Sequence, residues 1–389
     1  MKIRAAVLRE SGRGRPFAVS RALEVEEIDL EGPGAGQVLV RVASAGLCHS
    51  DLSAISGSRS RALPAVAGHE GAGVVAEVGE GVRDLSVGDK VVMVFVNSCG
   101  LCEFCTVGRS NLCQSSWAAR AEGSLSDGSR KLSVGGTPLH HWSGISSFAE
   151  YAVVSRSSLI RIDNDIPLLD AAVLGCAVIT GVGSVLNTAK VRAGDSVAVT
   201  GLGGVGLSAV MGARVAGAST IIAIDTVPKK LALALELGAT HAVNGRDPDS
   251  ADQVRDITDG GVQHSFEMAG VPVAAASAYS MVRRGGQLVV ASLPGPSVAL
   301  AIPLASHVGE EKRIVGAYMG SSVATRDIPR YAELYRQGRL PINRLRSAVL
   351  PLDDINIGFD RLADGKAVRD VIGFERVLAG DEVPRDSKP

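Results

Sequence analysis

Hydrophobic residues follow two patterns along the chain, and the pattern changes near Asp170. Before that residue, Val-rich runs such as QVLVRVASAGLC, GAGVVAEVG and DKVVMVFV are short and are separated by Gly or Asp-Lys turns, which is typical of β-strands. After it, apolar strands alternate with Ala-rich helical stretches, as in DSVAVTGLGGVGLSAVMGARVAGASTIIAID. This alternation is the βαβ pattern of a parallel sheet. The sequence therefore predicts an α/β protein with a β-rich domain and a doubly wound domain.

The alternation of strands and helices stops near Gly316. We therefore expect residues 178–316 to form the doubly wound domain, and residues 1–177 and 317–389 to form the β-rich domain. Two domains also agree with the length of 389 residues, which exceeds the size at which one core usually keeps growing.

The stretch between Trp117 and Phe148 is polar and rich in Gly and Ser. It is too irregular for a core element, so we expect a surface loop of the kind that often carries function. The adjacent residues His140 and His141 are expected to face solvent.

Charge and composition narrow the functional classes. The chain has 40 basic and 41 acidic residues, so it lacks the positive excess that binding to nucleic acid requires. It has no signal-peptide run at its N-terminus and no stretch approaching the ~20 apolar residues of a membrane helix, so we expect a cytoplasmic protein that binds no membrane. Disulfides rarely persist in that reducing compartment, and metal binding is the first candidate use for the six cysteines.

Four of these cysteines form a C-x2-C-x2-C-x7-C run: Cys99, Cys102, Cys105 and Cys113. This spacing lets one loop direct four thiolates at a tetrahedral zinc ion, and no position is left for substrate, so the site is predicted to be structural. Ligation of an iron–sulfur cluster is the alternative, because bacterial ferredoxins also contain C-x2-C-x2-C. There, however, Cys-Pro follows after three residues, whereas Cys113 follows after seven and precedes Gln114. Four unligated thiols are a weaker alternative.

Cys48 and Cys176 remain, and His69 and Glu70 of GHEGAGVV lie between them in the sequence. Two thiolates and an imidazole supply the three protein ligands of a catalytic zinc, whose fourth position is kept for water or substrate. Taken alone, Cys176 is more often a small core residue, and His69 a hydrogen-bonded structural imidazole.

A glycine-rich run, VAVTGLGGVGLSAV, follows an apolar strand and opens a helix-like segment. It is a G-x-G-x-x-G motif, which is typical of pyrophosphate binding at a helix N-terminus and comprises Gly201, Gly203, Gly204, Val205 and Gly206. Asp225 ends the next strand, where a carboxylate binds ribose hydroxyls and repels a 2'-phosphate, so NAD is favoured over NADP. The alternative is a glycine-rich turn without a ligand and an Asp that only caps the next helix.

The segments GLCHSDL, GHEGAGVVAEVGEGV, the four-cysteine run, LGCAVITGVGSV and GLGGVG occur in this order, and the resemblance extends to INIGFDRLADGKAVRDVIGF. Together they resemble the zinc-containing alcohol dehydrogenases of the medium-chain dehydrogenase/reductase superfamily over nearly the whole chain. The resemblance implies a GroES-like catalytic domain beside a Rossmann domain. It also implies one catalytic and one structural zinc per chain.

The resemblance further implies roles for single residues. On the catalytic side, Ser50 takes the proton of the substrate hydroxyl, Glu70 assists ligand exchange at the zinc held by Cys48, His69 and Cys176, and Asp51 orients His69. On the cofactor side, His49 and Arg369 contact the pyrophosphate, Lys230 the adenosine ribose and Thr180 the nicotinamide. Many relatives carry a histidine at the outer end of the proton relay, where this chain has Ser53.

The expected function is therefore hydride transfer between NAD(H) and a small primary alcohol or aldehyde, with zinc polarising the substrate oxygen. Aromatic or allylic substrates are included. One alternative is dehydrogenation of a thiol adduct of formaldehyde, and another is a non-catalytic redox sensor that binds zinc and a dinucleotide. The segment GAYMG resembles the edge strand through which family members pair, so we expect a homodimer, with a tetramer second.

Overall fold

The computed structural model describes residues 1–374, which form two compact units. One comprises Met1–Gly175 together with residues 346–374, and the other comprises Cys176–Leu345. The sequence predicts that the doubly wound domain ends at residue 316, whereas the second unit ends at Leu345. Residues 375–389 lie outside the described residues.

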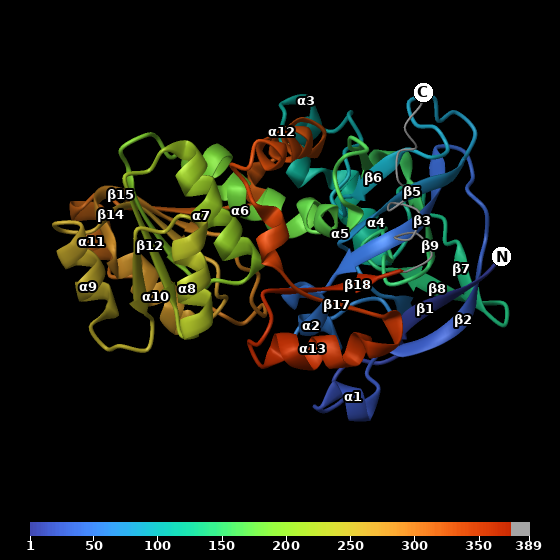
Figure 1. The fold of residues 1–389 in the computed structure, drawn as a ribbon, viewed down its shortest axis with the longest axis horizontal. Helices are drawn as coiled ribbons and strands as arrows, with labels where there is room; N and C mark the ends of the chain where they lie inside the picture. Colours follow the sequence, from blue (N-terminus) through green and yellow to red (C-terminus); the bar gives the residue numbers. More distant parts are fainter. Residues whose placement is uncertain (375–389) are drawn as a thin grey trace, which may run out of the picture. The chain divides into compact units, whose positions relative to one another are not determined.

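A seven-stranded sheet forms the centre of the first unit (Figure 1). Its strands lie in the order β10-β6-β5-β3-β18-β17, and β9 also pairs with β3. They are β10 (Leu159–Arg161), β6 (Lys90–Met93), β5 (Gly71–Val78), β3 (Gln37–Gly46), β18 (Arg369–Gly373), β17 (Arg346–Leu350) and β9 (Tyr151–Ser155). The Val-rich strand β3 is buried over almost its whole length, because its residues pack into apolar clusters on both faces of the sheet.

A second set of strands closes into a small barrel in the order β1-β2-β7-β8-β4. They are β1 (Lys2–Leu8), β2 (Glu24–Leu30), β7 (Leu132–Val134), β8 (Thr137–His141) and β4 (Ala65–Val66). The helical elements of this unit are short: α1 (Phe17–Ser20), α2 (His49–Ile55), α3 (Glu103–Thr106), η1 (Ser110–Leu112), α4 (Gln114–Glu122), η2 (Arg156–Ser158), α5 (Leu168–Ala171), η7 (Leu352–Asp354) and α13 (Ile355–Ala363). Phe359 of α13 meets Phe148 edge to face in the core, which joins the C-terminal segment to the N-terminal strands.

The second unit contains a six-stranded sheet in the order β13-β12-β11-β14-β15-β16, and all its pairings are parallel. Its strands are β13 (His241–Asn244), β12 (Thr220–Asp225), β11 (Ser196–Thr200), β14 (Val262–Glu267), β15 (Val282–Val290) and β16 (Arg313–Gly316). Numbered within the unit, this order is 3-2-1-4-5-6, the order of the Rossmann fold. The predicted fold class, an α/β protein with a β-rich unit and a doubly wound Rossmann unit, is therefore confirmed.

Helices connect these parallel strands and continue beyond them. They are η3 (Leu174–Val178), α6 (Ile179–Gly183), η4 (Ser184–Ala189), α7 (Gly204–Ala216), α8 (Pro228–Leu237), α9 (Ser250–Ile257), α10 (Pro272–Ser280), α11 (Leu304–Gly309), η5 (Tyr318–Ser321), α12 (Ala324–Arg336) and η6 (Ile342–Leu345). Residues after Gly316 stay with this unit because η5 packs closely on α6, where a side chain on Gly183 would overlap Gly320. Asn187 Nδ2 also donates to Ser322 Oγ over 3.1 Å.

The interpretation of GAYMG as an edge strand is wrong. Only its first residue, Gly316, belongs to β16, and Tyr318–Ser321 forms a 3-10 turn. Met319 and Gly320 have φ angles of 51° and 60°, and this left-handed backbone cannot continue a strand.

The statement that no segment approaches the length of a membrane helix is also wrong. The helix Leu168–Ala189 has 22 residues and is apolar enough to match such a segment in length and composition. It is almost entirely buried inside the fold, as the core helix of a globular protein is.

The segment between Trp117 and Phe148 is more ordered than the expected surface loop. It contributes α4, β7 and β8, and its Leu125, Leu132 and Leu139 are buried in the barrel core. His141 does not face solvent, because it ends β8 in the barrel and is 2% exposed. Its Nε2 accepts the backbone N–H of Lys131 over 3.1 Å.

His141 predicts a pH-dependent stability. Burial, with a smaller contribution from Arg130, lowers the pKa of His141 to about 3. Because the unfolded chain binds this proton near pH 6.5 and the folded chain does not, the folded state should lose stability as pH falls below 6.5. The slope contributed by this residue is at most about 1.4 kcal/mol per pH unit. Denaturant unfolding at pH 7.5, 6.5 and 5.5 should show that His141→Gln lacks this component. In the control His140→Gln it should remain; equal slopes in both variants would contradict the assignment.

Candidate functional site

Strand register brings the first predicted metal ligands together. Strands β3 and β5 are antiparallel, with Ser44 opposite Ala72. Cys48 follows the end of β3, and His69 and Glu70 immediately precede β5, so these residues lie at the same edge of the sheet.

The third strand at this edge is β18, in which Val371 is opposite Gly46. The same register places Arg369 beside Cys48, and its Nη2 lies 3.5 Å from the Cys48 sulfur. Nη2 also lies 2.9 Å from Oε1 of Glu70, and both side chains are buried. The guanidinium therefore offsets the charge of a carboxylate that would otherwise be costly to bury.

Cys176 reaches this group through the turn η3. The residue before it, Gly175, packs on the end of β6, where any side chain would overlap the carbonyl oxygen of Met93. The ligand atoms of four buried residues lie within 4.8 Å of one another: Cys48, His69, Glu70 and Cys176. The structure thus brings together the three predicted zinc ligands and Glu70.

The surroundings of His69 fit a bound cation. Nδ1 of His69 lies 2.8 Å from Oδ1 of Asp51, so the imidazole donates there and presents Nε2 as the ligand atom. Burial opposes a charge on His69, but the Asp51 carboxylate and Cys48 together raise its pKa well above the ordinary value. A site that favours positive charge, with two thiols and one imidazole, has the donor set of a zinc centre with an open position.

The other residues predicted near this metal lie on α2, which begins directly after Cys48. His49 is exposed and Ser50 is partly buried. Ser53 Oγ donates to the carbonyl oxygen of His49 over 2.8 Å, so its hydroxyl is held by the helix backbone.

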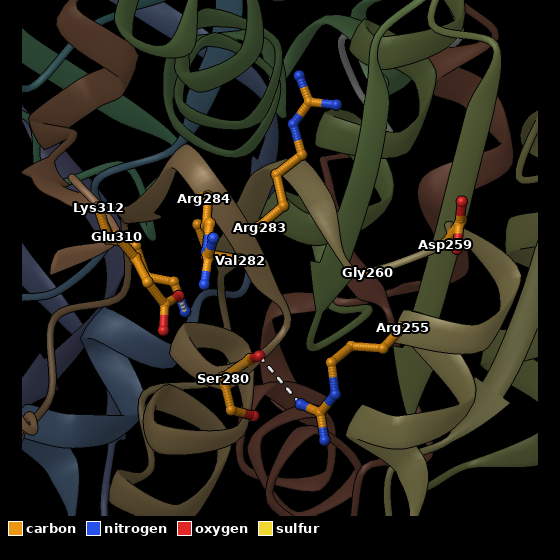
Figure 2. Close-up of a pocket in the computed structure, with 9 residues that line it drawn as sticks. All are labelled: Arg255, Asp259, Gly260, Ser280, Val282, Arg283, Arg284, Glu310 and Lys312. Atoms are coloured by element: carbon orange, nitrogen blue, oxygen red, sulfur yellow. Dashed lines mark hydrogen bonds and ion pairs between the residues drawn. The ribbon is translucent and has the colours of Figure 1, made fainter. Parts of the chain in front are cut away.

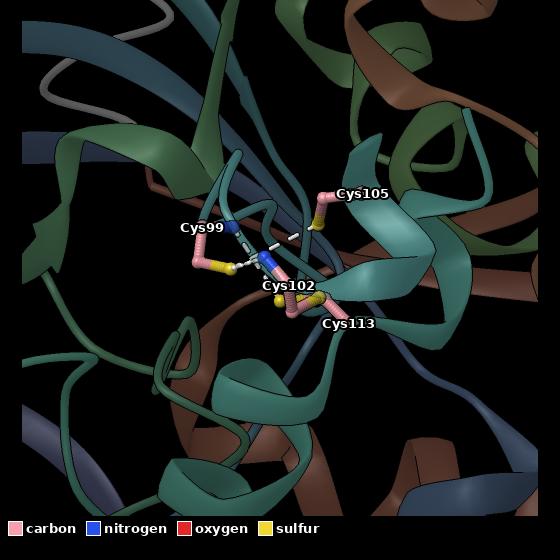
Figure 3. Close-up of side chains that lie close together, drawn as sticks. All are labelled: Cys99, Cys102, Cys105 and Cys113. Carbon is pink, nitrogen blue, oxygen red and sulfur yellow. Dashed lines mark hydrogen bonds between the residues drawn. The ribbon is translucent and has the colours of Figure 1, made fainter. Parts of the chain in front are cut away.

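The four-cysteine lobe forms a second metal group (Figure 3). Its four sulfur atoms lie within 4.8 Å of one another, and those of Cys99 and Cys105 are 4.0 Å apart. Zinc–sulfur bonds of ~2.3 Å in a tetrahedron require sulfur atoms about 3.8 Å apart, so the group fits one ion. Backbone N–H groups of Leu101 and Cys102 lower the pKa of Cys99 to about 6, whereas burial raises the pKa of Cys113 to about 11. Because the sulfur atoms are spaced as one zinc ion requires, the zinc prediction holds over the iron–sulfur alternative.

The glycine motif lies between β11 and α7, within the second unit. Gly201 has a φ of +93°, and Gly206 packs so closely that a side chain would overlap the Gly201 carbonyl. Gly203, the N-cap of α7, has open space where a side chain would stand. This geometry fits the close approach of a pyrophosphate to the helix N-terminus.

Asp225 ends β12 beside this loop, as expected. Its carboxylate accepts the backbone N–H groups of Leu202 over 2.7 Å and of Val227 over 2.9 Å, and these bonds fix its orientation. Lys230 lies on α8, and Thr180 is buried on α6, where its hydroxyl donates to the Met319 sulfur over 3.8 Å. The cofactor contacts proposed for these residues stay predictions.

A cleft of about 630 Å³ lies elsewhere in the second unit (Figure 2). Its lining residues include Gly260 before β14, Arg283 near the start of β15 and Lys312 before β16. They lie at the amino ends of the parallel strands, whereas the glycine loop lies at the carboxyl end of β11. Ligands of such sheets bind at the carboxyl ends, so this cleft is not the cofactor site.

Sequence reasoning missed Phe95 and the pairing of Glu70 with Arg369. The Phe95 ring meets the His69 ring edge to face, with centroids 5.0 Å apart. The only signal for Phe95 in the sequence was its place at the end of the strand-like run DKVVMVFV. Strand β6 of this run pairs with β5, which begins directly after His69 and Glu70, and Phe95 therefore lies near the metal group.

Comparisons with known proteins agree with this geometry. Residues 34–164 match the family model "Alcohol dehydrogenase GroES-like domain", and residues 204–337 match "Zinc-binding dehydrogenase". The chain is 40% identical over 379 residues to the S-(hydroxymethyl)glutathione dehydrogenase of Synechocystis sp.. The match covers 96% of this chain and 100% of that relative.

Two solved structures extend the likeness to the fold. One is an alcohol dehydrogenase zinc-binding domain protein from Burkholderia ambifaria, with a TM-score of 0.90 and 38% identity. The other is the benzyl alcohol dehydrogenase of Acinetobacter calcoaceticus, with a TM-score of 0.89 and 32% identity. Each match covers 96% of this chain and 99% of the chain in the solved structure.

The two metal groups predict separate responses to mutation. The purified chain should contain two zinc ions, and Cys102→Ser should remove the ion of the lobe alone. Asp51→Asn should retain both ions but weaken the ion at His69 by 10- to 100-fold, because it weakens the bond that orients the imidazole. Zinc analysis during titration with a chelator measures both effects. A wild-type content near one ion would exclude one site, and unchanged chelator resistance in Asp51→Asn would exclude the role of Asp51.

Proposed function

We propose a substrate and a cofactor for a chain that belongs to the zinc-dependent alcohol dehydrogenases of the medium-chain dehydrogenase/reductase superfamily. The chain is an oxidoreductase, and this membership leaves no support for the alternative of a non-catalytic sensor. We propose that it interconverts primary alcohols, including aromatic ones, and their aldehydes with NAD(H). The observation that carries the proposal is the buried group of Cys48, His69 and Cys176, with Asp51 behind the imidazole.

These three residues would hold the catalytic zinc. When bound, zinc acts as a Lewis acid that lowers the pKa of the substrate hydroxyl and so favours hydride transfer to the nicotinamide. Arg369, 3.5 Å from the Cys48 sulfur, limits the negative charge that the thiolates bring to the site. Glu70 would assist exchange of the ligand in the open position.

Ser50 would accept the proton of the substrate hydroxyl at its Oγ. It stands two residues after Cys48, in the first turn of α2. Ser53 is left out of the proton path because its hydroxyl already donates to the His49 carbonyl. Water or the cofactor ribose would complete the path.

The second unit would hold the cofactor. Gly201, Gly203 and Gly206 would receive the pyrophosphate at the N-terminus of α7, and His49 and Arg369 would add positive charge. The Asp225 carboxylate, held by two backbone N–H groups, would bind the adenosine ribose and repel a 2'-phosphate. Lys230 and Thr180 would contact the ribose and the nicotinamide.

Oxidation of S-(hydroxymethyl)glutathione is the second candidate, since it is the activity named for the relative at 40% identity. We favour the alcohol because the Phe95 ring borders His69 and offers an aromatic surface beside the metal group.

We also propose a cytoplasmic homodimer. The cytoplasmic location is supported by the six cysteines, none of which forms a disulfide, as is expected in a reducing compartment. The dimer is supported by β16, which has one strand partner among the described residues, β15, and so leaves its other edge for a second chain. Light scattering tests the dimer, and a monomeric mass would exclude it.

The substrate proposal predicts activity without a thiol. Purified, zinc-loaded protein should reduce NAD with benzyl alcohol, and glutathione should not change the rate. Its kcat/KM should exceed that for formaldehyde mixed with glutathione. Activity that appears only with formaldehyde and glutathione would instead establish the second candidate.

Asp225 predicts the cofactor preference. Asp225→Gly should raise the ratio of kcat/KM for NADP to that for NAD on the order of tenfold, because the charge that repels the 2'-phosphate is lost. Asp225→Asn should shift the ratio in the same direction. Asp259→Gly makes the same charge change before β14, at the amino ends of the strands, whereas Asp225 lies at their carboxyl ends. This control should leave the ratio as in the wild type. If all three variants share the wild-type ratio, Asp225 is not at the ribose.

A further inference from the structure

The cleft at the amino ends of the parallel strands lies beside an irregular part of the sheet (Figure 2). Strand β14 pairs with β15 at Val262 opposite Val282, and again at His264 opposite Gln287. Between these two pairs β14 contributes one residue, whereas β15 contributes four, Arg283–Gly286. A bulge of this kind leaves its extra residues outside the sheet and redirects their side chains.

Two glycines determine the shape of this bulge. Gly285 has a φ of 71°, and its N–H donates to the carbonyl oxygen of Glu310 over 2.8 Å. Any side chain on Gly286 would overlap a backbone carbonyl of β14, so only glycine lets β15 return to the sheet there. The bulge is therefore a defined structure, and it presents Arg283 and Arg284 to the cleft.

The two arginine side chains leave the bulge in different directions. Figure 2 shows Arg284 on the side of Glu310 and Lys312, and Arg283 extending away from them. The Lys312 ammonium lowers the pKa of Glu310, and the charge of Arg284 lowers it further. Burial lowers the pKa of His264, and the charge of Arg283 adds to that effect. The bulge thus supplies positive charge on both of its sides.

The cleft has more positive charge than its own acidic groups offset. Its lining contains four basic and two acidic side chains. Lys312 is paired with Glu310 over 2.9 Å, and Arg255 donates to a backbone carbonyl over 3.1 Å. Arg283 and Arg284 are exposed, and neither side chain forms an ion pair or hydrogen bond within the part of the chain that the structure describes. Two guanidiniums therefore remain for a ligand.

We propose that this cleft binds a small molecule that carries a chain of two or three phosphate groups. A guanidinium presents a planar fork of N–H donors that matches phosphate oxygens. A single phosphate would lie on one side of the bulge and meet one guanidinium, whereas a phosphate chain spans the bulge and meets both Arg283 and Arg284. The cleft volume of about 630 Å³ lies in the range of small-molecule sites.

The charge of the ligand favours phosphate over carboxylate. A phosphate group carries up to about two negative charges at neutral pH, whereas a carboxylate carries one. The site is also separate from the glycine loop, because the cleft lies at the amino ends of the strands and the loop at the carboxyl end of β11.

Isothermal titration calorimetry with inorganic tripolyphosphate tests this site. The zinc-loaded protein is first saturated with NADH, which fills the glycine loop, so that the heat reports a second site. One tripolyphosphate should bind per chain, and inorganic phosphate should bind at least about tenfold more weakly, because it lacks one charge-assisted contact. Absence of saturable tripolyphosphate binding would overturn the proposal.

Variants of the two arginines should weaken this binding in steps. Arg284→Gln should raise the Kd for tripolyphosphate about tenfold, and the double variant Arg283→Gln/Arg284→Gln about 100-fold. Arg339→Gln is the matched control, since it removes an exposed guanidinium of the same unit that does not line the cleft, and it should keep the wild-type Kd. Equal heats in the wild type and the double variant, as chelation of zinc or binding at the glycine loop would give, would overturn the proposal.

Two further ligands in the same titration define the chemical class. If ATP binds with the same loss in Arg284→Gln, the ligand is a nucleoside triphosphate; if only tripolyphosphate shows this loss, the cleft recognises the phosphate chain of another molecule. Citrate, which carries three carboxylates, should bind more weakly than tripolyphosphate, and equal affinity would overturn the assignment to phosphate. Calorimetry does not depend on turnover, so this inference and the proposed function can fail independently of each other.

Discussion

The antiparallel pairing of β3 with β5 and β18 is the constraint on which the metal group depends. Cys48 leaves the end of β3, His69 and Glu70 lead into β5, and Arg369 opens β18. A shift of one residue in either pairing would turn these side chains to the other face of the sheet, because side chains alternate along a strand. Val38, Val40 and Val42 of β3 oppose such a shift, since it would turn them away from the apolar cluster in which they pack. Packing of apolar residues therefore sets the geometry of a polar site.

The same edge of the sheet holds several buried charges that depend on one another. Glu70 lies against Arg369, Asp51 lies against His69, and Arg369 also reaches the Cys48 sulfur. Removing one member of such a set leaves another charge buried without compensation, which is strongly destabilising in proteins. A side chain at Gly46 would overlap the Glu70 carboxylate, so the backbone also leaves room for the set. The site is best understood as one charge-balanced unit into which a cation fits.

The sequence was sufficient for those parts of the molecule that depend on local spacing. The C-x2-C-x2-C-x7-C run predicted the lobe because all four ligands lie within one loop, and the glycine motif predicted the turn before α7 for the same reason. Cys176 and His69 needed the family resemblance, because no local pattern relates residues so far apart.

Other features were beyond sequence reasoning because they depend on tertiary contacts. His141 was expected in solvent, but the barrel closes around it. The segment GAYMG contains apolar residues that suit a strand, but close packing on α6 turns it into a left-handed bend. The contact between Glu70 and Arg369 joins two ends of the chain and has no signature in either segment.

The buried helix Leu168–Ala189 has a consequence for the distance over which the reaction takes place. It carries both Cys176, a proposed zinc ligand, and Thr180, the proposed neighbour of the nicotinamide. Between them the backbone passes from the π-helical turn η3 directly into α6, so the two residues lie about one helical turn apart. The span between the proposed zinc ligand and the proposed neighbour of the nicotinamide is thus set within a single helix. Loops around the site can then change without altering this span.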